Sequence, residues 1–204
     1  MAKSKVKDKQ PVRVSALLPT ENDFIVDYAN LRLQERKNLT AIQVLAYTGQ
    51  HETAAAAIGK SLGIECPIEP GICNSDDHLQ LTWNGPNSWM IIAGDAESGY
   101  KPDGLLETLK KAVGERAAVI DQSHGRCGLR LSGKHARAVM AKNCAIDLHP
   151  RAFKTGNCAL TPVAHMSALV VQVDDTPCYD LFIARSLARS FAHAIEHACK
   201  EFAT

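Results

Sequence analysis

The stretch LAYTGQH at residues 45–51 recurs in altered form as LRLSGKH at residues 129–135, an offset of 84 (129 − 45). In both copies alternating apolar residues run into a Thr-Gly or Ser-Gly pair, and a run with helical character follows. Gly49 and Gly133 therefore stand between a predicted strand and a predicted helix, where a residue that accepts a positive φ favours a tight turn. The repeat predicts that one strand-turn-helix unit occurs twice in the chain.

The residues on either side of 45–51 predict the elements of the first half of the chain. Ile42, Val44 and Ala46 alternate with their neighbours as in a strand, and the alanine-rich run that follows His51 has high helix propensity. The expected elements are a strand from Thr40 to Ala46, a helix over 53–62, a hairpin over 79–92 with its turn at 84–87, and a helix from Pro102 that closes the half near Glu115.

The second half repeats this order of elements. The expected elements are a strand over 127–131, a helix over 135–143, strands over 168–173 and 179–184, and a last helix that carries Leu187, Phe191, Ile195, Ala198 and Phe202 on one side. Residues 71–73 (GIC) match residues 156–158 (GNC) at an offset of 85 (156 − 71), which small loop insertions explain. We predict one duplicated α+β domain over 38–204, with halves of about 38–115 and 116–204.

Residues 1–37 are predicted to precede this domain as a basic N-terminal arm and an extended lead-in. The arm carries lysines at positions 3, 5, 7 and 9 and few apolar residues, so a frayed, solvated tail is favoured over a segment that orders on a partner. The lead-in mixes apolar and charged residues in no clean period, and we assign it no element. Its apolar content suggests packing against this domain or a neighbour.

Composition limits the classes of partner and compartment. The 204 residues are 46% hydrophobic and 22% charged, which is typical of a globular domain with a buried core. Lys plus Arg (23) and Asp plus Glu (22) nearly cancel, so binding to nucleic acid through net charge is not expected. Since no apolar run is long enough for a membrane span or a signal peptide, we expect a cytoplasmic protein.

The seven cysteines and the histidines give no metal or disulfide pattern. The cysteines are odd in number and lack CxxC or CxxH spacing, so reduced, buried thiols are expected rather than a disulfide framework or structural zinc. His193 and His197 stand four residues apart on the last helix, but a third ligand is not implied and a solvated helix face is the favoured interpretation.

Catalytic motifs are weak in this sequence. Residues 121–124 (DQSH) hold catalytic residue types, but adjacent Ser123 and His124 on a strand would point to opposite faces, which argues against a serine hydrolase. The sequence lacks G-x-S-x-G, P-loop and G-x-G-x-x-G patterns, so we expect no catalytic residue, metal or cofactor site in this chain, and any flavin or NAD should belong to another chain.

Residues 147–153 (DLHPRAF) form the candidate interface. After a helix and around a proline they display a carboxylate, an imidazole, a guanidinium and an aromatic ring, on Asp147, His149, Arg151 and Phe153. Arginine and aromatic residues are enriched where partners bury each other. A loop anchored within this chain explains the composition almost as well.

Several of these stretches resemble the gamma subunit family of bacterial heterotetrameric sarcosine oxidases. The DLHPRAF run is the most specific, and residues 121–124 (DQSH), 131–133 (LSG) and 136–139 (ARAV) support it. The likeness extends over roughly Thr40 to Phe202 through residues 67–70 (PIEP), 83–89 (WNGPNSW) and 174–186. It does not cover residues 1–37.

The resemblance implies a fold and a role. It implies kinship with the folate-binding domain of the glycine-cleavage aminomethyltransferase, whose fold is two interlocked β-α-β-β-α halves. It further implies a non-catalytic subunit beside alpha, beta and delta chains, in a complex that oxidatively demethylates sarcosine to glycine. Formaldehyde or methylenetetrahydrofolate and hydrogen peroxide are the implied products, and FAD, FMN, NAD and tetrahydrofolate are implied to lie in the other subunits.

Two alternatives stay open at this point. A stand-alone folate-dependent one-carbon transfer protein would need an acid to hold the pteridine, for which Asp174, Asp175 and Asp180 are candidates, although an acidic hairpin turn is the favoured role. The same subunit could also serve a related N-methyl amine oxidoreductase, because substrate choice depends on the active-site pocket.

Overall fold

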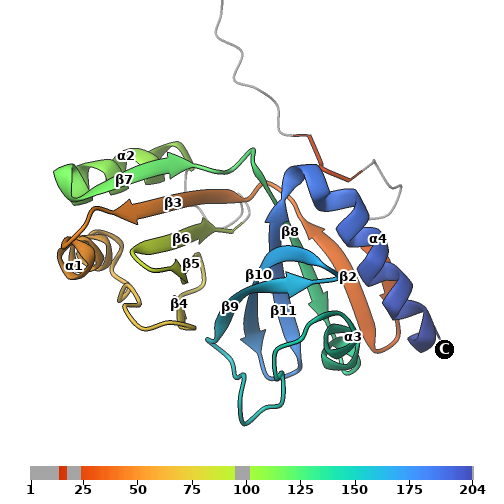
Figure 1. Ribbon diagram of the computed structural model, residues 1–204. Helices are drawn as coiled ribbons and strands as arrows, with labels where there is room; N and C mark the ends of the chain where they lie inside the picture. Colours follow the sequence, from red (N-terminus) through yellow and green to blue (C-terminus); the bar gives the residue numbers. More distant parts are fainter. Residues whose placement is uncertain (1–13, 18–23, 95–101, 204) are drawn as a thin grey trace, which may run out of the picture.

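The computed structural model describes residues 14–17, 24–94 and 102–203. Within these residues two antiparallel sheets lie face to face, and helices cover the outer face of each sheet (Figure 1). The layers are therefore helix, sheet, sheet, helix, which is the predicted α+β class. No helix in the described part of the chain is long and apolar enough to cross a membrane.

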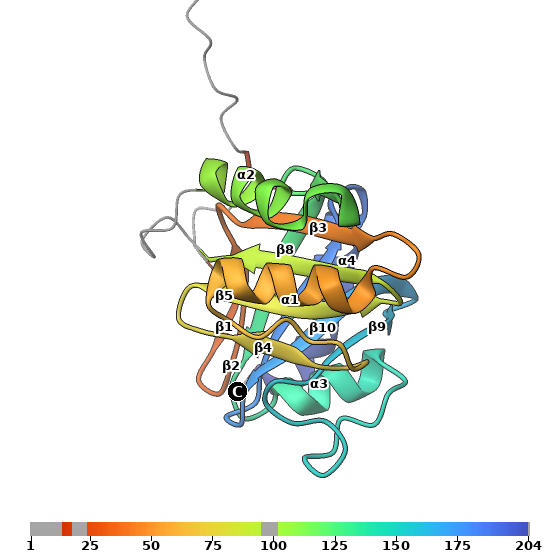
Figure 2. The ribbon, with the colours of Figure 1, turned by 90° about the vertical axis from the view of Figure 1, so that its left-hand side faces the viewer.

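The five-stranded sheet has the strand order β4-β5-β6-β3-β7. Figure 2 shows α1 and α2 lying across its outer face. In chain order its elements are β3 (Thr40–Ala46), α1 (His51–Leu62), β4 (Cys73–Ser75), β5 (Leu79–Gly85), β6 (Ser88–Ala93), α2 (Pro102–Val113) and β7 (Ala117–Asp121).

The six-stranded sheet has the order β1-β2-β8-β11-β10-β9 and carries α3 and α4 on its outer face. Its elements are β1 (Phe24–Tyr28), β2 (Leu31–Arg36), β8 (Arg126–Ser132), α3 (Ala136–Asn143), β9 (Cys158–Val163), β10 (Met166–Asp174), β11 (Cys178–Ala184) and α4 (Ala188–Cys199). A short 3₁₀ turn at 114–116 follows α2. Two others flank α4, one before it at 185–187 and one after it at 200–202.

The two halves exchange one strand each. β2 directly precedes β3 in the chain, yet it pairs with β8 in the six-stranded sheet. β7 directly precedes β8, yet it pairs with β3 in the five-stranded sheet. Each sheet is thus completed by a strand from the other half, which confirms the interlocked arrangement that the family resemblance implied.

The lead-in before residue 38 is partly a piece of the folded body. Residues 24–36 form the antiparallel hairpin β1–β2 at the edge of the six-stranded sheet. Val26, Leu31 and Leu33 are buried in the core beneath α3 and α4. Placing all of residues 1–37 ahead of the domain was therefore wrong for this hairpin, and its apolar content reflects packing within the chain. The lysine-bearing arm lies outside the described residues.

The match between residues 71–73 and 156–158 marks a local two-fold relation. The Cys73 N–H donates to the Gly156 carbonyl at 2.8 Å, and the Cys158 N–H donates to the Gly71 carbonyl at 2.8 Å. Gly71 and Gly156 have φ of 80° and 82°. The repeat found in the sequence is therefore a pair of equivalent turns that join the two sheets.

The offset of 84 inferred for residues 45–51 needs a correction of one residue within the strand. Leu129 faces α3 and α4, whereas Leu45 faces the opposite way and is partly exposed; Val44 is the buried residue beneath α1 and α2. Side chains alternate between the faces of a strand, so a one-residue slip places equivalent residues on opposite sides. The offset that preserves the buried face is 85 (129 − 44), as in the pair of turns.

The core has three parts, two between a sheet and its helices and one between the sheets. The inter-sheet part contains Leu39, Met90, Ile92, Leu169 and Phe182. Because the strands are buried on both faces, near-continuous apolar runs such as residues 88–93 replace the alternation of a half-exposed sheet.

Most predicted elements are confirmed. The strand Thr40–Ala46 matches β3, the expected helices match α1, α2, α3 and α4 within a few residues, and the two hairpins match β5–β6 and β10–β11. Five strands were not predicted from the sequence, and they lie at or next to a sheet edge: β1, β2, β4, β7 and β9.

All seven cysteines are buried and unpaired. Burial raises the pKa of the Cys66, Cys127 and Cys158 thiols to about 12. Because the thiolate is the reactive form, these side chains behave as small core hydrophobes rather than nucleophiles at neutral pH.

We expect Gly133→Ala to destabilise the protein far more than Gly49→Ala. Gly133 has φ of 110°, and a Cβ there would collide with the Asn30 carbonyl in the β1–β2 turn. Gly49 has φ of 76° in the corresponding turn, with open space around it. Strain plus collision should cost about 2 to 4 kcal/mol at Gly133, against about 1 kcal/mol at Gly49. Urea unfolding of the full chain measures the free energy of unfolding of both variants. Equal losses would contradict the close approach of the Gly133 turn to the β1–β2 turn.

Candidate functional site

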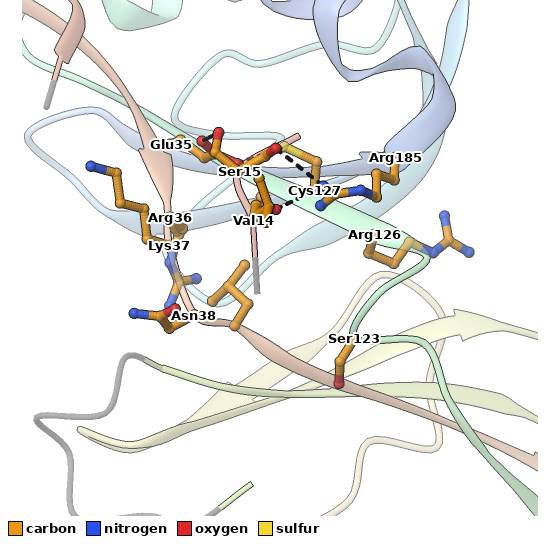
Figure 3. A pocket seen from close by; sticks show the side chains of 12 residues that line it. Val14, Ser15, Glu35, Arg36, Lys37, Asn38, Ser123, Arg126, Cys127 and Arg185 are labelled. Carbon is orange, nitrogen blue, oxygen red and sulfur yellow. Dashed lines mark hydrogen bonds between the residues drawn. The ribbon is translucent and has the colours of Figure 1, made fainter. Parts of the chain in front are cut away.

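The connections that exchange strands between the halves run side by side and border a cavity. The Gln122 N–H donates to the Ala41 carbonyl at 2.8 Å, and the Ala41 N–H donates to Ser123 Oγ at 3.1 Å. The cavity has a volume of about 120 Å³ (Figure 3). It is lined by Val14, Ser15, Glu35, Arg36, Lys37, Asn38, Leu39, Ser123, Arg126, Cys127, Gly128 and Arg185.

Four basic side chains and one acid line this cavity. Glu35 accepts hydrogen bonds from Ser15 Oγ and, at 3.2 Å, from the Ala16 N–H. Arg185 Nη2 donates to the carbonyl of Val14 at 2.7 Å, so residues 14–17 are held against β2 and β8 (Figure 3). Burial lowers the pKa of Arg126. A volume of this size holds a few water molecules and is well below the ~300 Å³ of pockets that enclose cofactor-sized ligands.

Asp180 is the one carboxylate that is completely buried among the described residues. It lies on β11 and faces the space between the sheets. Its Oδ1 accepts from Arg130 Nε at 2.7 Å, and its Oδ2 accepts from Arg130 Nη2 at 2.8 Å and from Arg36 Nη1 at 2.6 Å. Gln80 Nε2, from the other sheet, donates to Oδ2 at 3.0 Å. The carboxylate therefore joins β2, β8 and β11 to β5.

Both oxygens of Asp180 are engaged in this network, and the residue is completely buried. Arg130 lies directly opposite Asp180 in the β8–β11 ladder and holds both oxygens as a fork, and the hydrogen bond to Asp180 raises the pKa of Arg130. Arg36 also lies 5.7 Å from the centre of the Phe182 ring. Asp180 thus does not fit the role of an acid that holds a pteridine. The sequence signal was a lone carboxylate within the apolar strand CYDLFIA, and Arg36 was missed because no strand was assigned there.

The other two candidate acids lie in the β10–β11 hairpin turn. Asp174 Oδ1 accepts from the Thr176 N–H at 2.8 Å and from Thr176 Oγ1 at 2.5 Å. Asp175 Oδ1 accepts from Thr155 Oγ1 at 2.9 Å. These contacts order the turn, which agrees with the favoured role of an acidic hairpin turn.

Residues 121–124 form a turn rather than a continuous strand, which corrects the geometry expected from the sequence. β7 ends at Asp121, and Asp121 Oδ1 accepts from the Ser123 N–H at 2.8 Å. Ser123 Oγ accepts from the backbone of β3, while His124 is exposed. Ser123 and His124 therefore do not lie on opposite faces of a strand; instead, Ser123 is positioned as a backbone partner at the strand exchange.

The DLHPRAF loop joins α3 to β9. Leu148 and Phe153 are buried in the core beneath α3 and α4, and they anchor the loop in this chain. Asp147 Oδ1 accepts from the His149 N–H at 2.8 Å, and His149 Nδ1 accepts from the Arg151 N–H at 3.2 Å. The structure thus brings Asp147, His149 and Arg151 together on an exposed turn and separates Phe153 from them.

His193 and His197 lie exposed on α4. Together with His165 they border a hollow of about 500 Å³ between α4 and the β9–β10 turn. Within the described ranges, no group of three or more histidine, cysteine or acidic side chains has the spacing of a metal site.

Comparison with known proteins first defines the class of fold. The glycine cleavage system aminomethyltransferase T from Bartonella henselae has a solved structure that matches 82% of this chain and 46% of that chain, with a TM-score of 0.58 and 16% identity. At this identity the match shows the fold alone. The protein therefore has the duplicated α+β fold of the aminomethyltransferase.

Closer relatives define the family. A family model described as sarcosine oxidase, gamma subunit family matches residues 48–201. Sarcosine oxidase subunit gamma from Arthrobacter sp is 33% identical over 153 residues, which are 73% of this chain and 70% of that protein. A chain in the structure of heterotetrameric sarcosine oxidase from Corynebacterium sp. U-96 matches with a TM-score of 0.78 and 27% identity, covering 89% of this chain and 90% of that chain. The chain belongs to the sarcosine oxidase gamma subunit family.

Removing the charge of Asp180 should destabilise the fold strongly. We expect Asp180→Asn to lower the free energy of unfolding by about 3 to 5 kcal/mol, because it leaves two arginines without their buried counterion. Asp27→Asn is the matched control, since Asp27 pairs with Arg32 at 2.9 Å on the surface and should contribute less than about 1 kcal/mol. Urea unfolding at neutral pH measures both variants. A loss at Asp180 no larger than at Asp27 would show that the buried network contributes little to the stability of the fold.

Proposed function

We propose that this chain is the non-catalytic gamma subunit of a heterotetrameric sarcosine oxidase. The observation that carries the proposal is the match over nine-tenths of both chains to a subunit of the Corynebacterium enzyme. In the proposed complex, sarcosine is oxidatively demethylated to glycine with release of formaldehyde, or methylenetetrahydrofolate, and hydrogen peroxide. The alpha, beta and delta subunits are the proposed partners, and FAD, FMN, NAD and tetrahydrofolate are proposed to reside in them. A cytoplasmic location stays a prediction.

A role in assembly is supported by the way the polar side chains of the body are used. The buried carboxylate of Asp180 accepts hydrogen bonds from two arginines and a glutamine, and Ser123 Oγ accepts a hydrogen bond from the backbone of β3. These groups hold the two halves together. The subunit would therefore contribute a rigid surface to the complex, while the reaction takes place in the partner chains.

We further propose that the exposed turn of the DLHPRAF loop contacts a partner. Asp147, His149 and Arg151 are exposed and locked by local hydrogen bonds, so their display costs little further ordering on binding. Phe153 contributes as the buried anchor of the loop rather than as a contact residue.

Co-purification tests this proposal. Tagged full-length chain from its host should elute with larger, flavin-bearing chains whose fractions turn over sarcosine, and Arg151→Glu should reduce the recovery of those chains by tenfold or more. Arg189→Glu, an exposed position on α4, is the matched control and should leave the recovery unchanged. If the native chain runs as a monomer without flavin absorbance, the subunit role is wrong. Turnover of another N-methyl amine in place of sarcosine by the same fractions would favour the related oxidoreductase.

The stand-alone folate-dependent alternative makes a separate prediction. Because Asp180 is completely buried in its ion-pair network and the turn acids are engaged locally, we expect no saturable binding when tetrahydrofolate is titrated into the isolated chain and followed by calorimetry. Asp175→Asn serves as the comparison variant. A saturable signal that Asp175→Asn abolishes would instead establish a folate site at the hairpin turn.

A further inference from the structure

The outer edge of β7 carries backbone groups that have no partner. The β3–β7 register pairs Leu45 with Ala118 and Gln43 with Ile120. The hydrogen bonds from the Tyr47 N–H to Arg116 and from the Gln122 N–H to Ala41 extend this alternation beyond both ends of β7. Residues 118 and 120 therefore turn their N–H and C=O groups toward β3, and residues 117, 119 and 121 turn theirs away. No hydrogen bond reaches these outward groups from any residue that the structure describes.

The duplication shows what occupies this position in the other half. β2 stands beside β8 as β7 stands beside β3, and the outer edge of β2 carries β1 as a sixth strand. β1 reaches this place because it is the hairpin partner that directly precedes β2. The segment that directly precedes β7 is α2 with its 3₁₀ turn, and α2 covers the face of the sheet. The chain next to β7 therefore cannot supply the equivalent sixth strand.

The other sheet edges of the described chain are each protected, and β7 is not. The turns beside β4 and β9 are bridged to one another between residues 72 and 157, and β9 also contains Pro162. The β1 ladder is interrupted by a bulge near Val26. Bulges, prolines and short or covered strands are the usual means of preventing edge pairing. β7, with the sequence AAVID, has no proline, lysine or bulge.

The side chains of β7 suit the arrival of another strand. Ile120 is 40% exposed and is the large apolar residue on the inter-sheet face of β7, with Ala118 partly exposed beside it. On the other face Val119 packs beneath the helices. In the six-stranded sheet α4 lies against β1 as well, so a strand beside β7 would be sheltered by α2 in the same way.

We propose that an extended segment of another subunit of the complex pairs with β7 and completes the five-stranded sheet as its sixth strand. This inference rests on the proposed subunit role. Main-chain hydrogen bonds to residues 117, 119 and 121 supply the attachment, as in other cases of strand addition. The segment has apolar side chains, preferably β-branched, beside Ile120, and a basic residue opposite Asp121.

Residue-resolved amide hydrogen exchange of the isolated full chain and of the purified complex tests this inference. The N–H groups of residues 117, 119 and 121 should exchange rapidly in the isolated chain and at least 100-fold more slowly in the complex. Those of residues 118 and 120 should be protected in both states. This alternation with a period of two is specific for strand pairing, since burial by a helix or loop would slow neighbouring amides alike.

Three outcomes would overturn the inference. Protection in the isolated chain that is lost on deletion of residues 1–13 would assign the edge to the chain's own arm. Protection that rises with concentration, together with dimers in light scattering, would assign it to a second copy. Absence of protection in a complex that has co-purified intact would show that β7 stays free, and it would leave the proposed subunit role standing.

Substitutions at β7 test whether this edge is needed to bind the partner chains. Ile120→Lys places a charge beside the free edge and should reduce recovery of the partner chains at least tenfold. Leu160→Lys is the matched control, since Leu160 is 48% exposed on the protected edge strand β9 and should leave recovery unchanged. Val119→Pro removes one outward N–H without touching the β3 ladder and should act like Ile120→Lys. Thermal melts of the full chain confirm that each variant folds, and wild-type recovery with folded Ile120→Lys contradicts the proposal.

Discussion

The carboxylate of Asp180 stands where the strand exchange closes, and it ties the exchanged strand β2 to β8 and β11. Two arginines reach it from β8 and from the exchanged strand β2, and a glutamine reaches it from the opposite sheet. The forked pair with Arg130 lies within the six-stranded sheet and fixes the distance and register of β8 and β11, whereas apolar packing is non-directional. The network therefore holds the exchanged strand β2 in place within the six-stranded sheet, and removing one partner leaves charges that the interior cannot solvate.

The two halves have the same order of elements but different chemistry at this place. When the strand registers are superposed, the positions of Asp180, Arg130 and Arg36 fall on Ser88, Leu45 and Ile120. One half thus closes its sheet with buried charges and a sixth strand, and the other leaves an apolar residue at an open edge. The duplication explains the shared order of strands and helices, and these three positions are places where the side chains of the two halves differ.

How far the sequence could predict this structure follows from which contacts are local. The helices and the two hairpins were found because their apolar periodicity and turn residues lie within one short window. The edge strands β4, β7 and β9 were missed because they are short and lack a clear alternation. The exchange of β2 and β7 could not be derived, since pairing between distant strands leaves no period in the sequence. Among the site residues, Asp180 carried a signal as a lone acid in an apolar strand, but Arg36 carried none.

Only part of the DLHPRAF loop is available to contact a partner, because some of its residues are buried in this chain. Its apolar members, Leu148 and Phe153, are buried in this chain, so a variant at either would alter binding only through the fold. Its polar members are ordered by one another and not by the core. The free edge of β7 differs from this loop because it presents backbone N–H and C=O groups. Since every residue type but proline has both groups, such an edge leaves no motif in the sequence. The edge becomes visible when the two sheets are compared strand by strand. β2 has β1 as its outer neighbour, whereas the equivalent position beside β7 is empty among the described residues.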